Sequence, residues 1–314
     1  MAEKSLIERV RRRAGLSPAL MTGIGDDCAV MRLPPAHDLL FTTDFTLEDV
    51  HFRRAWHPPE VVGRRCLTRG LSDIAAMGGA PVACFLSLAL PSKTPQSWVD
   101  RFLTGLLGLA REFQIPLAGG DTAQSAGGIH ADIVVVGEVP KGKVVLRSGA
   151  RPGDSIYVTG ELGGSAAAIR QLEKGRIRAT DYPGHFHPTP RVLAGTWLRK
   201  RNLASAMIDL SDGLSTDLGH ICEESEVGAE IDASAIPRAQ VGHPPRRVDF
   251  DLCLHGGEDY ELLFMSSRHV PELVAGVSVT RIGKVTRKCE MALVGLDGRR
   301  RNLVARGWEH FRKR

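Results

Sequence analysis

The chain has 314 residues, enough for two domains with a proper hydrophobic core. Hydrophobic residues make up 43% and charged residues 25%, and the 34 glycines and 18 prolines follow no period, so collagen, coiled coils and wholesale disorder are excluded. No apolar run reaches the roughly 18 residues that cross a bilayer, and residues 1–13 lack the apolar stretch of a signal peptide. We therefore expect a cytoplasmic protein with no membrane partner.

The chain is basic, with 41 Lys and Arg against 36 Asp and Glu and a formal net charge of +5. The excess lies in short runs such as Arg299–Arg301 and Arg312–Arg314, which a nucleic-acid-binding protein could use. The chain has only three tyrosines and no motif of an RNA- or DNA-binding module. We expect no nucleic-acid partner, and we interpret the charge as solubilising the protein and attracting an anionic substrate.

Cysteine and histidine spacing gives no sign of a zinc site. The six cysteines lie far apart, without a C-x-x-C pair, and are predicted to be free buried thiols. His185 and His187 are close in sequence, but no Cys or acid lies beside them, so we do not expect a metal there.

The first half of the chain alternates predicted strands and helices. Helix 60–77 is the clearest, because apolar residues recur at helical spacing and Gly78-Gly79-Ala80-Pro81 ends it. The predicted elements are a helix over 5–13, a strand over 39–44, the helix over 60–77, a strand over 82–90, a helix over 97–113, a short strand over 115–118 and a strand over 132–139.

A turn at Arg151–Asp154 precedes a second set of elements. These are a strand over 155–159, a helix from 165, a loop over 180–190, a helix over 191–201, a strand over 206–208 and a helix over 214–226. Alternation in both halves, with a punctuated centre near residues 140–153, predicts two α/β or α+β domains.

The acidic residues fall in an informative pattern. Asp44, Asp121 and Asp209 directly follow apolar strand-like runs, and strand ends are where α/β folds build sites. Each could instead be a turn former or a helix N-cap. If such carboxylates converged, neighbours about 5 Å apart would repel by about 3 kcal/mol per pair and would need cations. Oxygen ligands suit Mg²⁺, which in turn suggests a polyphosphate substrate.

Common catalytic motifs are missing from the sequence. There is no G-x-x-x-x-G-K-[ST] loop, protein-kinase set, G-x-S-x-G elbow or H-E-x-x-H. Residues Gly160–Gly164 precede a predicted helix and could hold an anion through helix N-terminal amides, or could simply form a tight turn.

Seven short segments occur in a characteristic order along the chain: Gly25–Ala29, Thr42–Asp44 with Val50–Phe52, Ser72–Gly78, Gly119–Thr122, Arg147–Asp154, Asp209–Leu214 and Gly256–Leu262. In this order they resemble the thiamine-monophosphate kinases, relatives of aminoimidazole ribonucleotide synthetase, selenophosphate synthetase and the hydrogenase maturation dehydratase. The resemblance runs from about residue 5 to residue 311.

The resemblance implies a reaction in which ATP and thiamine monophosphate give thiamine diphosphate and ADP with several Mg²⁺ ions, by direct in-line transfer without a side-chain nucleophile. It also implies residues 1–140 as an ATP- and Mg²⁺-binding domain whose sheet pairs across a homodimer, and 150–314 as a second α/β domain. The implied metal ligands are Asp27, Thr42, Thr43, Asp44, Asp73, Asp121, Asp209 and Asp212. The implied nucleotide contacts are Gly120, Asp121, Arg147 and Ser211, and the implied thiamine monophosphate contacts are His51, Glu258 and Trp308.

One position departs from the family. Leu103 stands where many relatives carry a Tyr, so any contact there with the nucleotide would be apolar. Two other interpretations stay open at this point: an ATP-using enzyme of the same superfamily with another substrate, and a non-catalytic anion- or nucleic-acid-binding protein that uses the basic runs.

Overall fold

A computed structural model describes residues 3–15, 17–22, 24, 29–32, 34–295 and 297–309 of the protein. The chain forms two compact units. Unit 1 comprises residues up to Ile74 together with Gly79–Gly142, and unit 2 comprises Ala75–Gly78 together with the residues from Lys143 onward. The predicted metal ligand Asp27 lies outside the described residues.

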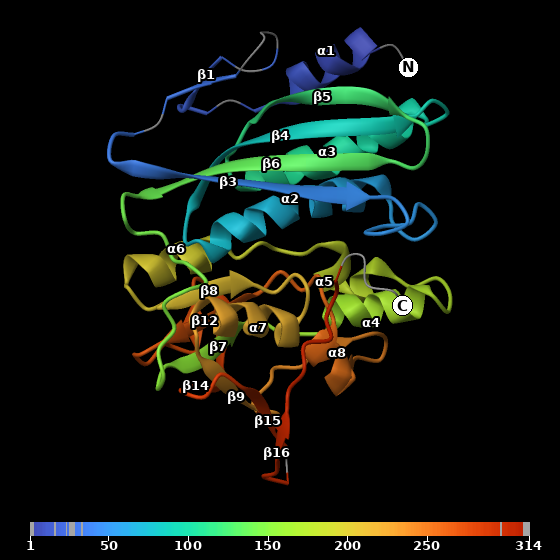
Figure 1. Ribbon diagram of the computed structural model, residues 1–314. Coiled ribbons are helices and arrows are strands. Elements are labelled where there is room, and N and C mark those ends of the chain that lie inside the picture. The colour runs from blue at the N-terminus through green and yellow to red at the C-terminus, as the bar shows by residue number, and fades with distance from the viewer. Residues whose placement is uncertain are drawn as a thin grey trace. The chain divides into compact units, whose positions relative to one another are not determined.

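Unit 1 is built on a four-stranded sheet with the order β3-β6-β4-β5 (Figure 1). Strands β4 and β5 are parallel, and the other two pairs are antiparallel. The strands are β3 (His37–Leu47), β4 (Ala80–Pro91), β5 (Leu117–Ser125) and β6 (His130–Pro140); α1 (Glu3–Arg13) and the small β1 (Leu20–Thr22) and β2 (Val30–Met31) pair complete the unit.

Helices α2 (Pro59–Ala76) and α3 (Gln96–Glu112) cover one face of this sheet (Figure 1). Glycines bring the helices together, because a Cβ on Gly63 would lie 1.9 Å from the Phe102 carbonyl oxygen and one on Gly105 only 1.8 Å from that of Glu60. The apolar helix faces, with Leu67, Leu71, Phe102 and Leu106, are buried against the sheet. Among the described residues, no helix covers the opposite face of the sheet (Figure 1).

The predicted elements of unit 1 are all present, but the strands are longer than their apolar runs. Asp44 lies within β3 and Asp121 within β5, so the prediction that these carboxylates end their strands is wrong. Hydrogen bonding to the neighbouring strands carries β3 on past Asp44 to Leu47 and β5 on past Asp121 to Ser125. Side-chain polarity alone therefore did not mark where the pairing stops.

Unit 2 contains an eight-stranded sheet whose main path is β16-β15-β9-β14-β7-β12-β8, with β13 paired to β14. All of these pairs are antiparallel except β9 with β15. Its strands are β7 (Ser155–Thr159), β8 (Ala206–Asp209), β9 (Gly228–Asp232), β12 (Leu262–Ser266), β13 (Leu273–Val274), β14 (Val277–Thr286), β15 (Met291–Val294) and β16 (Arg300–Asn302); β10 (Gln240–Val241) and β11 (Arg246–Arg247) form a separate pair.

The helices of unit 2 follow the predicted order with one correction. The stretch predicted as a loop over 180–190 contains a 3-10 turn, η1 (Ala179–Asp181), and the short helix α5 (Pro183–Phe186). Pro183 stands at the first position of α5, where a missing N–H costs no hydrogen bond. The remaining helices are α4 (Gly164–Leu172), α6 (Val192–Lys200), α7 (Leu214–Glu224) and α8 (Phe250–His255).

The cysteine prediction is confirmed for Cys66, Cys84, Cys222 and Cys253, which are free and buried, and is wrong for Cys289, which is exposed; Cys28 lies outside the described residues. Burial raises the pKa of the Cys66 thiol to about 12, so this sulfur stays protonated. In the part of the chain that the structure describes, no helix combines the length and hydropathy that a membrane span requires.

Candidate active site

Three predicted metal ligands of unit 1 meet between β3 and α2. Thr42 and Asp44 are two residues apart on β3, so both point to the same face of the sheet. The Thr42 hydroxyl donates a hydrogen bond to the Asp73 carboxylate from α2. Asp44 lies 3.5 Å from a guanidinium nitrogen of Arg69, one helical turn before Asp73. The α2-facing side of β3 therefore holds a polar cluster of Thr42, Asp44 and Asp73, with Arg69 as a buried cation.

Thr43 and Asp121 do not join this cluster. Thr43 alternates with Thr42 and points to the open face of the sheet, where its hydroxyl is 3.3 Å from Asp132 Oδ1. Asp121 pairs with the exposed Ser87 and shares that open face. Since β3 and β5 are the two edges of the sheet, three strand spacings of about 4.8 Å place Asp44 and Asp121 roughly 14 Å apart. The metal roles of Thr43 and Asp121 stay predictions.

His51 lies in the loop after β3. Its Nδ1 accepts a hydrogen bond from the Leu47 backbone N–H at 3.0 Å, which places the ring proton on Nε2. Glu48 fixes the same loop, because its carboxylate accepts a hydrogen bond from Ile129 N at 2.8 Å and pairs with Arg54. The ring orientation of His51 is therefore set by backbone contacts at the end of β3.

The residues predicted to contact the nucleotide have different local roles. A Cβ on Gly120 would lie 1.9 Å from the Leu86 carbonyl oxygen, so β5 requires a glycine there to approach β4. The carbonyl of Arg147 accepts a hydrogen bond from Ser225 Oγ at 3.0 Å, and its side chain is exposed. Leu103 is only 1% exposed, so it offers a nucleotide almost no surface.

In unit 2, the loop between β8 and α7 gathers the remaining predicted residues. We call residues 209–213 the acidic loop. Its backbone continues the pairing of β8 with the segment before β12: Tyr260 N donates to Leu210 O at 2.9 Å, and Glu258 N donates to Ser211 O at 2.8 Å. The structure therefore places Glu258, a predicted thiamine monophosphate contact, directly against Ser211, a predicted nucleotide contact.

Asp212 is held from two sides. Its backbone N–H and that of Gly213 donate to the Asp217 carboxylate of α7 at 3.2 and 2.9 Å. Its carbonyl accepts a hydrogen bond from Trp308 N at 3.0 Å. Unit 2 thus brings together five predicted residues from three distant segments: Asp209, Ser211, Asp212, Glu258 and Trp308.

The acidic loop carries concentrated negative charge. Asp217 is 1% exposed, and burial together with Asp209 and Asp212 raises the pKa of its carboxyl well above the usual value. Carboxylate oxygens of Asp212 and Asp217 and a ring nitrogen of His220 all lie within 4.8 Å of one another. These oxygen donors fit a hard divalent cation, whose charge would relieve the repulsion.

Two acids beside Glu258 that sequence reasoning did not single out, the half-buried Asp259 and the buried Glu261, hold this segment in place. Asp259 accepts hydrogen bonds from Gly163 N at 2.7 Å and Ser165 N at 3.3 Å, capping α4, and burial raises the pKa of its carboxyl to about 7. Glu261 binds Arg191 through two hydrogen bonds of 2.7 and 2.5 Å. The signal in the sequence was the dense acidic segment Glu258–Glu261, but only the fold shows that Asp259 caps α4 and that Glu261 pairs with Arg191.

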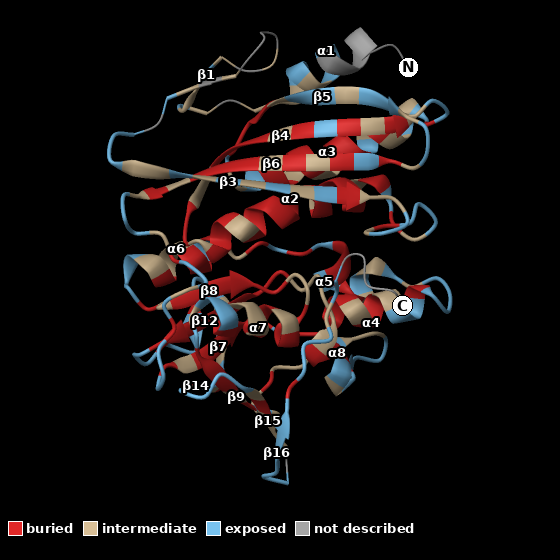
Figure 2. Ribbon diagram, viewed as in Figure 1, coloured by how far each residue is buried: buried red, intermediate tan, exposed pale blue. Residues whose placement is uncertain are grey.

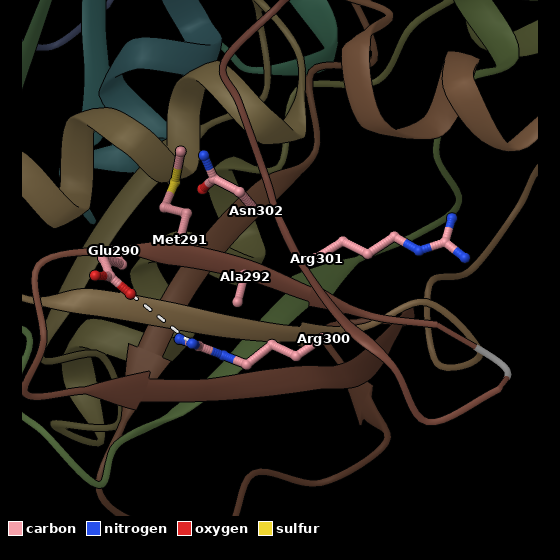
Figure 3. A pocket seen from close by; sticks show the side chains of 6 residues that line it. All are labelled: Glu290, Met291, Ala292, Arg300, Arg301 and Asn302. Atoms are coloured by element: carbon pink, nitrogen blue, oxygen red, sulfur yellow. Dashed lines mark ion pairs between the residues drawn. The ribbon is translucent and has the colours of Figure 1, made fainter.

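A cavity of about 430 Å³ beside β15 and β16 is lined by Glu290, Met291, Ala292, Arg300, Arg301 and Asn302 (Figure 3). None of the predicted site residues lines it. Arg300 is paired with Glu290 at 3.8 Å and with Glu230 at 3.6 Å, and Arg301 lies 3.5 Å from Asp297. Acidic neighbours therefore offset much of this basic run, which weakens the anion-binding alternative.

The two units match two family models. Residues 25–139 match the N-terminal domain of AIR synthase related proteins, and residues 151–295 match the C-terminal domain. The thiamine-monophosphate kinase of Salmonella typhimurium strain LT2 is 38% identical over 98% of both chains. The chain belongs to the thiamine-monophosphate kinase family. The family identity confirms the resemblance and the two-domain α/β fold class.

Solved structures of the family agree with this fold. The crystal structure of thiamine-monophosphate kinase from Stenotrophomonas maltophilia K279a superposes with a TM-score of 0.80 at 33% identity, covering 95% of this chain and 97% of that one. A second structure, described as AaThiL complexed with AMPPCP and TMP, gives 0.77 at 31% identity and covers 98% and 96%. That relative of the thiamine-monophosphate kinase family was thus solved with both ligands.

Proposed function

We propose that this protein transfers the terminal phosphoryl group of ATP to thiamine monophosphate and releases thiamine diphosphate and ADP. The observation that carries the proposal is the acidic loop, where predicted metal, nucleotide and thiamine monophosphate contacts lie on hydrogen-bonded neighbouring segments. The family relative complexed with AMPPCP and TMP supports both substrates. The test is ADP release from ATP and Mg²⁺ with and without thiamine monophosphate; release without dependence on thiamine monophosphate would contradict the proposal.

We propose that two sets of oxygen donors hold Mg²⁺: Thr42, Asp44 and Asp73 in unit 1, and Asp209 and Asp212 in unit 2. We propose a further, separate Mg²⁺ contact for Asp121 on the open face of the unit 1 sheet. Bound Mg²⁺ supplies charge neutralisation for phosphate oxygens. The residues do the positioning. Asp217 fixes the Asp212 backbone, the Thr42 hydroxyl orients Asp73, and Arg69 limits the repulsion around Asp44.

The reaction needs no side-chain nucleophile, because the acceptor phosphate is already ionised near neutral pH. A loose phosphoryl-transfer transition state needs alignment and charge neutralisation above all. The exposed Arg147 supplies fixed positive charge, and Ser211 offers a hydroxyl on the acidic loop. We therefore propose direct in-line transfer between the two bound phosphates.

We also propose that the protein is a homodimer that pairs the open faces of two unit 1 sheets. Odd-numbered residues of β3 leave large apolar side chains on this face: Phe41 is 67% exposed, Phe45 56% and Leu39 45%. Figure 2 colours parts of β3 as exposed. Large apolar side chains exposed together in this way mark an interaction site.

Phe41→Asp combined with Phe45→Asp is expected to convert the dimer to a monomer of 34.1 kDa, because two charges would be buried at the interface. Sedimentation equilibrium at micromolar concentration measures the mass. Leu273→Asp is the matched control, since Leu273 is 65% exposed in unit 2 and its replacement should leave the dimer intact. A wild-type protein that sediments as a monomer would contradict the proposal.

Trp308→Ala is expected to raise the KM for thiamine monophosphate between several-fold and about thirtyfold and to leave the KM for ATP nearly unchanged, because the indole would stack on the cationic thiazolium. Trp308→Phe should recover much of the loss. The side chain is 38% exposed, so its removal should cost little stability. A large fall in melting temperature, or equal weakening of both substrates, would show that Trp308 only secures the chain.

A further inference from the structure

Residues 303–308, which we call the strap, run from β16 to the acidic loop (Figure 1). Leu303 is buried, and its N–H donates to Met291 O at 3.0 Å. The side chains from Val304 to Arg306 and that of Trp308 are exposed. Side-chain burial therefore does not explain where the far end of the strap lies.

Backbone hydrogen bonds fasten that end to the start of α7. Arg306 N donates to Ser215 Oγ at 3.3 Å, Gly307 N donates to Thr216 Oγ1 at 2.9 Å, and Trp308 N donates to Asp212 O at 3.0 Å. Three successive N–H groups thus point at one helix end. Such an arrangement fixes the direction of the strap as well as its position.

The first of these acceptors is itself fixed. Ser215 is completely buried, and its hydroxyl lies 2.8 Å from His255 Nδ1 at the end of α8. Because the hydroxyl oxygen accepts from Arg306 N, its proton is available to donate to the imidazole nitrogen. The strap is therefore linked through Ser215 to a second helix.

The strap backbone comes very close to the acidic loop at Gly307. A Cβ on this residue would lie 2.2 Å from the Asp212 carbonyl oxygen and 2.6 Å from Thr216 Oγ1. No side chain fits at these distances, and the Asp212 carbonyl is backbone that Asp217 already restrains from the other side. Any larger residue at position 307 must push the strap away from the acidic loop.

We propose that Gly307 is a positioning residue whose bare backbone lets the strap seat Trp308 against the acidic loop, so that the place of the indole depends on the Asp212 peptide. The proposal rests on the proposed function for the identity of the ligand. It adds a physical link between a predicted metal-binding loop and a predicted thiamine monophosphate contact. If Gly307 had only a structural role, its replacement would not change the KM for thiamine monophosphate relative to the KM for ATP. A positioning role predicts that this ratio changes.

Gly307→Ala is the main test, with Gly184→Ala as the matched control because a Cβ on Gly184 meets no atom within 4 Å. We expect Gly307→Ala to raise the KM for thiamine monophosphate roughly tenfold, with the KM for ATP within about twofold of wild type. Hydrogen exchange at the amides of residues 306–308 should become faster in the unliganded Gly307→Ala protein. Gly184→Ala should match wild type in both measurements.

A second pair of variants separates the hydrogen bond from the steric effect. Thr216→Val removes the acceptor for Gly307 N while keeping the side-chain shape, and Thr216→Ser restores the hydroxyl. We expect the valine variant to move the same KM and the same amides in the same direction, and the serine variant to behave like wild type.

The outcomes are distinguishable from failure of the proposed function. A wild-type protein that does not phosphorylate thiamine monophosphate would overturn the proposed function. An active Gly307→Ala enzyme with wild-type KM values would overturn the positioning role, and unchanged exchange at residues 306–308 in both Gly307→Ala and Thr216→Val would overturn the attachment itself, whatever the activity.

Discussion

Asp121→Asn is expected to lower kcat by about a thousandfold or more while leaving stability within about 0.5 kcal/mol of wild type. The carboxylate is exposed on β5 and accepts a hydrogen bond from the neighbouring Thr122 N at 2.8 Å. The change keeps the shape of the side chain and removes the charge that would hold Mg²⁺. Steady-state assays at saturating Mg²⁺ and urea unfolding measure the two effects.

The control for Asp121→Asn is Asp297→Asn, the same chemical change beside β16, where no predicted site residue lies. A companion variant, Asp44→Asn, should lose activity to a similar extent and also lose stability, because it leaves the buried Arg69 guanidinium without that carboxylate. Near-normal turnover of Asp121→Asn would contradict its role in metal binding.

Arg191→Met is expected to destabilise unit 2 by about 3–5 kcal/mol, because it leaves the Glu261 carboxylate buried without its cation. The Glu261 side chain is only 6% exposed, and it holds Arg191 through both carboxylate oxygens. One further hydrogen bond, from Thr159 Oγ1 at 2.6 Å, would remain. The free energy of unfolding in urea measures the loss.

Combining Arg191→Met with Glu261→Gln should recover part of the stability lost in the single variant, because the double change buries no uncompensated charge. A loss below about 1 kcal/mol for Arg191→Met alone would show that the pair behaves like an exposed ion pair. We also expect weaker substrate binding in Arg191→Met. The Glu261 carbonyl accepts a hydrogen bond from Leu210 N at 2.7 Å, so a displaced Glu261 would disturb the acidic loop.

The sequence predicted the elements of unit 1 and the order of the helices in unit 2 up to residue 226, because long apolar periods and glycine stops mark them. It did not predict which face each strand residue occupies. Thr42 and Thr43 are chemically alike, and only the docking of α2 decides that Thr42 meets Asp73 while Thr43 meets Asp132. Apart from β14 (Val277–Thr286), the strands described after residue 226 have five residues or fewer, and long-range pairing rather than local pattern defines them.

The candidate site was predictable in type and only partly in arrangement. Acidic residues beside Gly, Ser and Thr indicated oxygen ligands, and the acidic loop does collect several of them. The contacts of Asp217 and Trp308 that hold the acidic loop were not predictable, because they are made to its backbone groups, which every sequence contains. Nothing in the residue type of Gly307 distinguishes a glycine that approaches Asp212 from one that merely forms a turn.

The alternation along β3 has a consequence for how this protein could change over evolution. The proposed metal ligands Thr42 and Asp44 occupy even-numbered positions that face α2, and the exposed Phe41 and Phe45 occupy odd-numbered positions on the other face. Inserting or deleting one residue in β3 would exchange the two sets, placing phenylalanines toward Asp73 and carboxylates on the outer face. A change in the length of β3 would therefore disturb both faces of the strand at once. A substitution at an odd-numbered position leaves the residues at even-numbered positions facing α2.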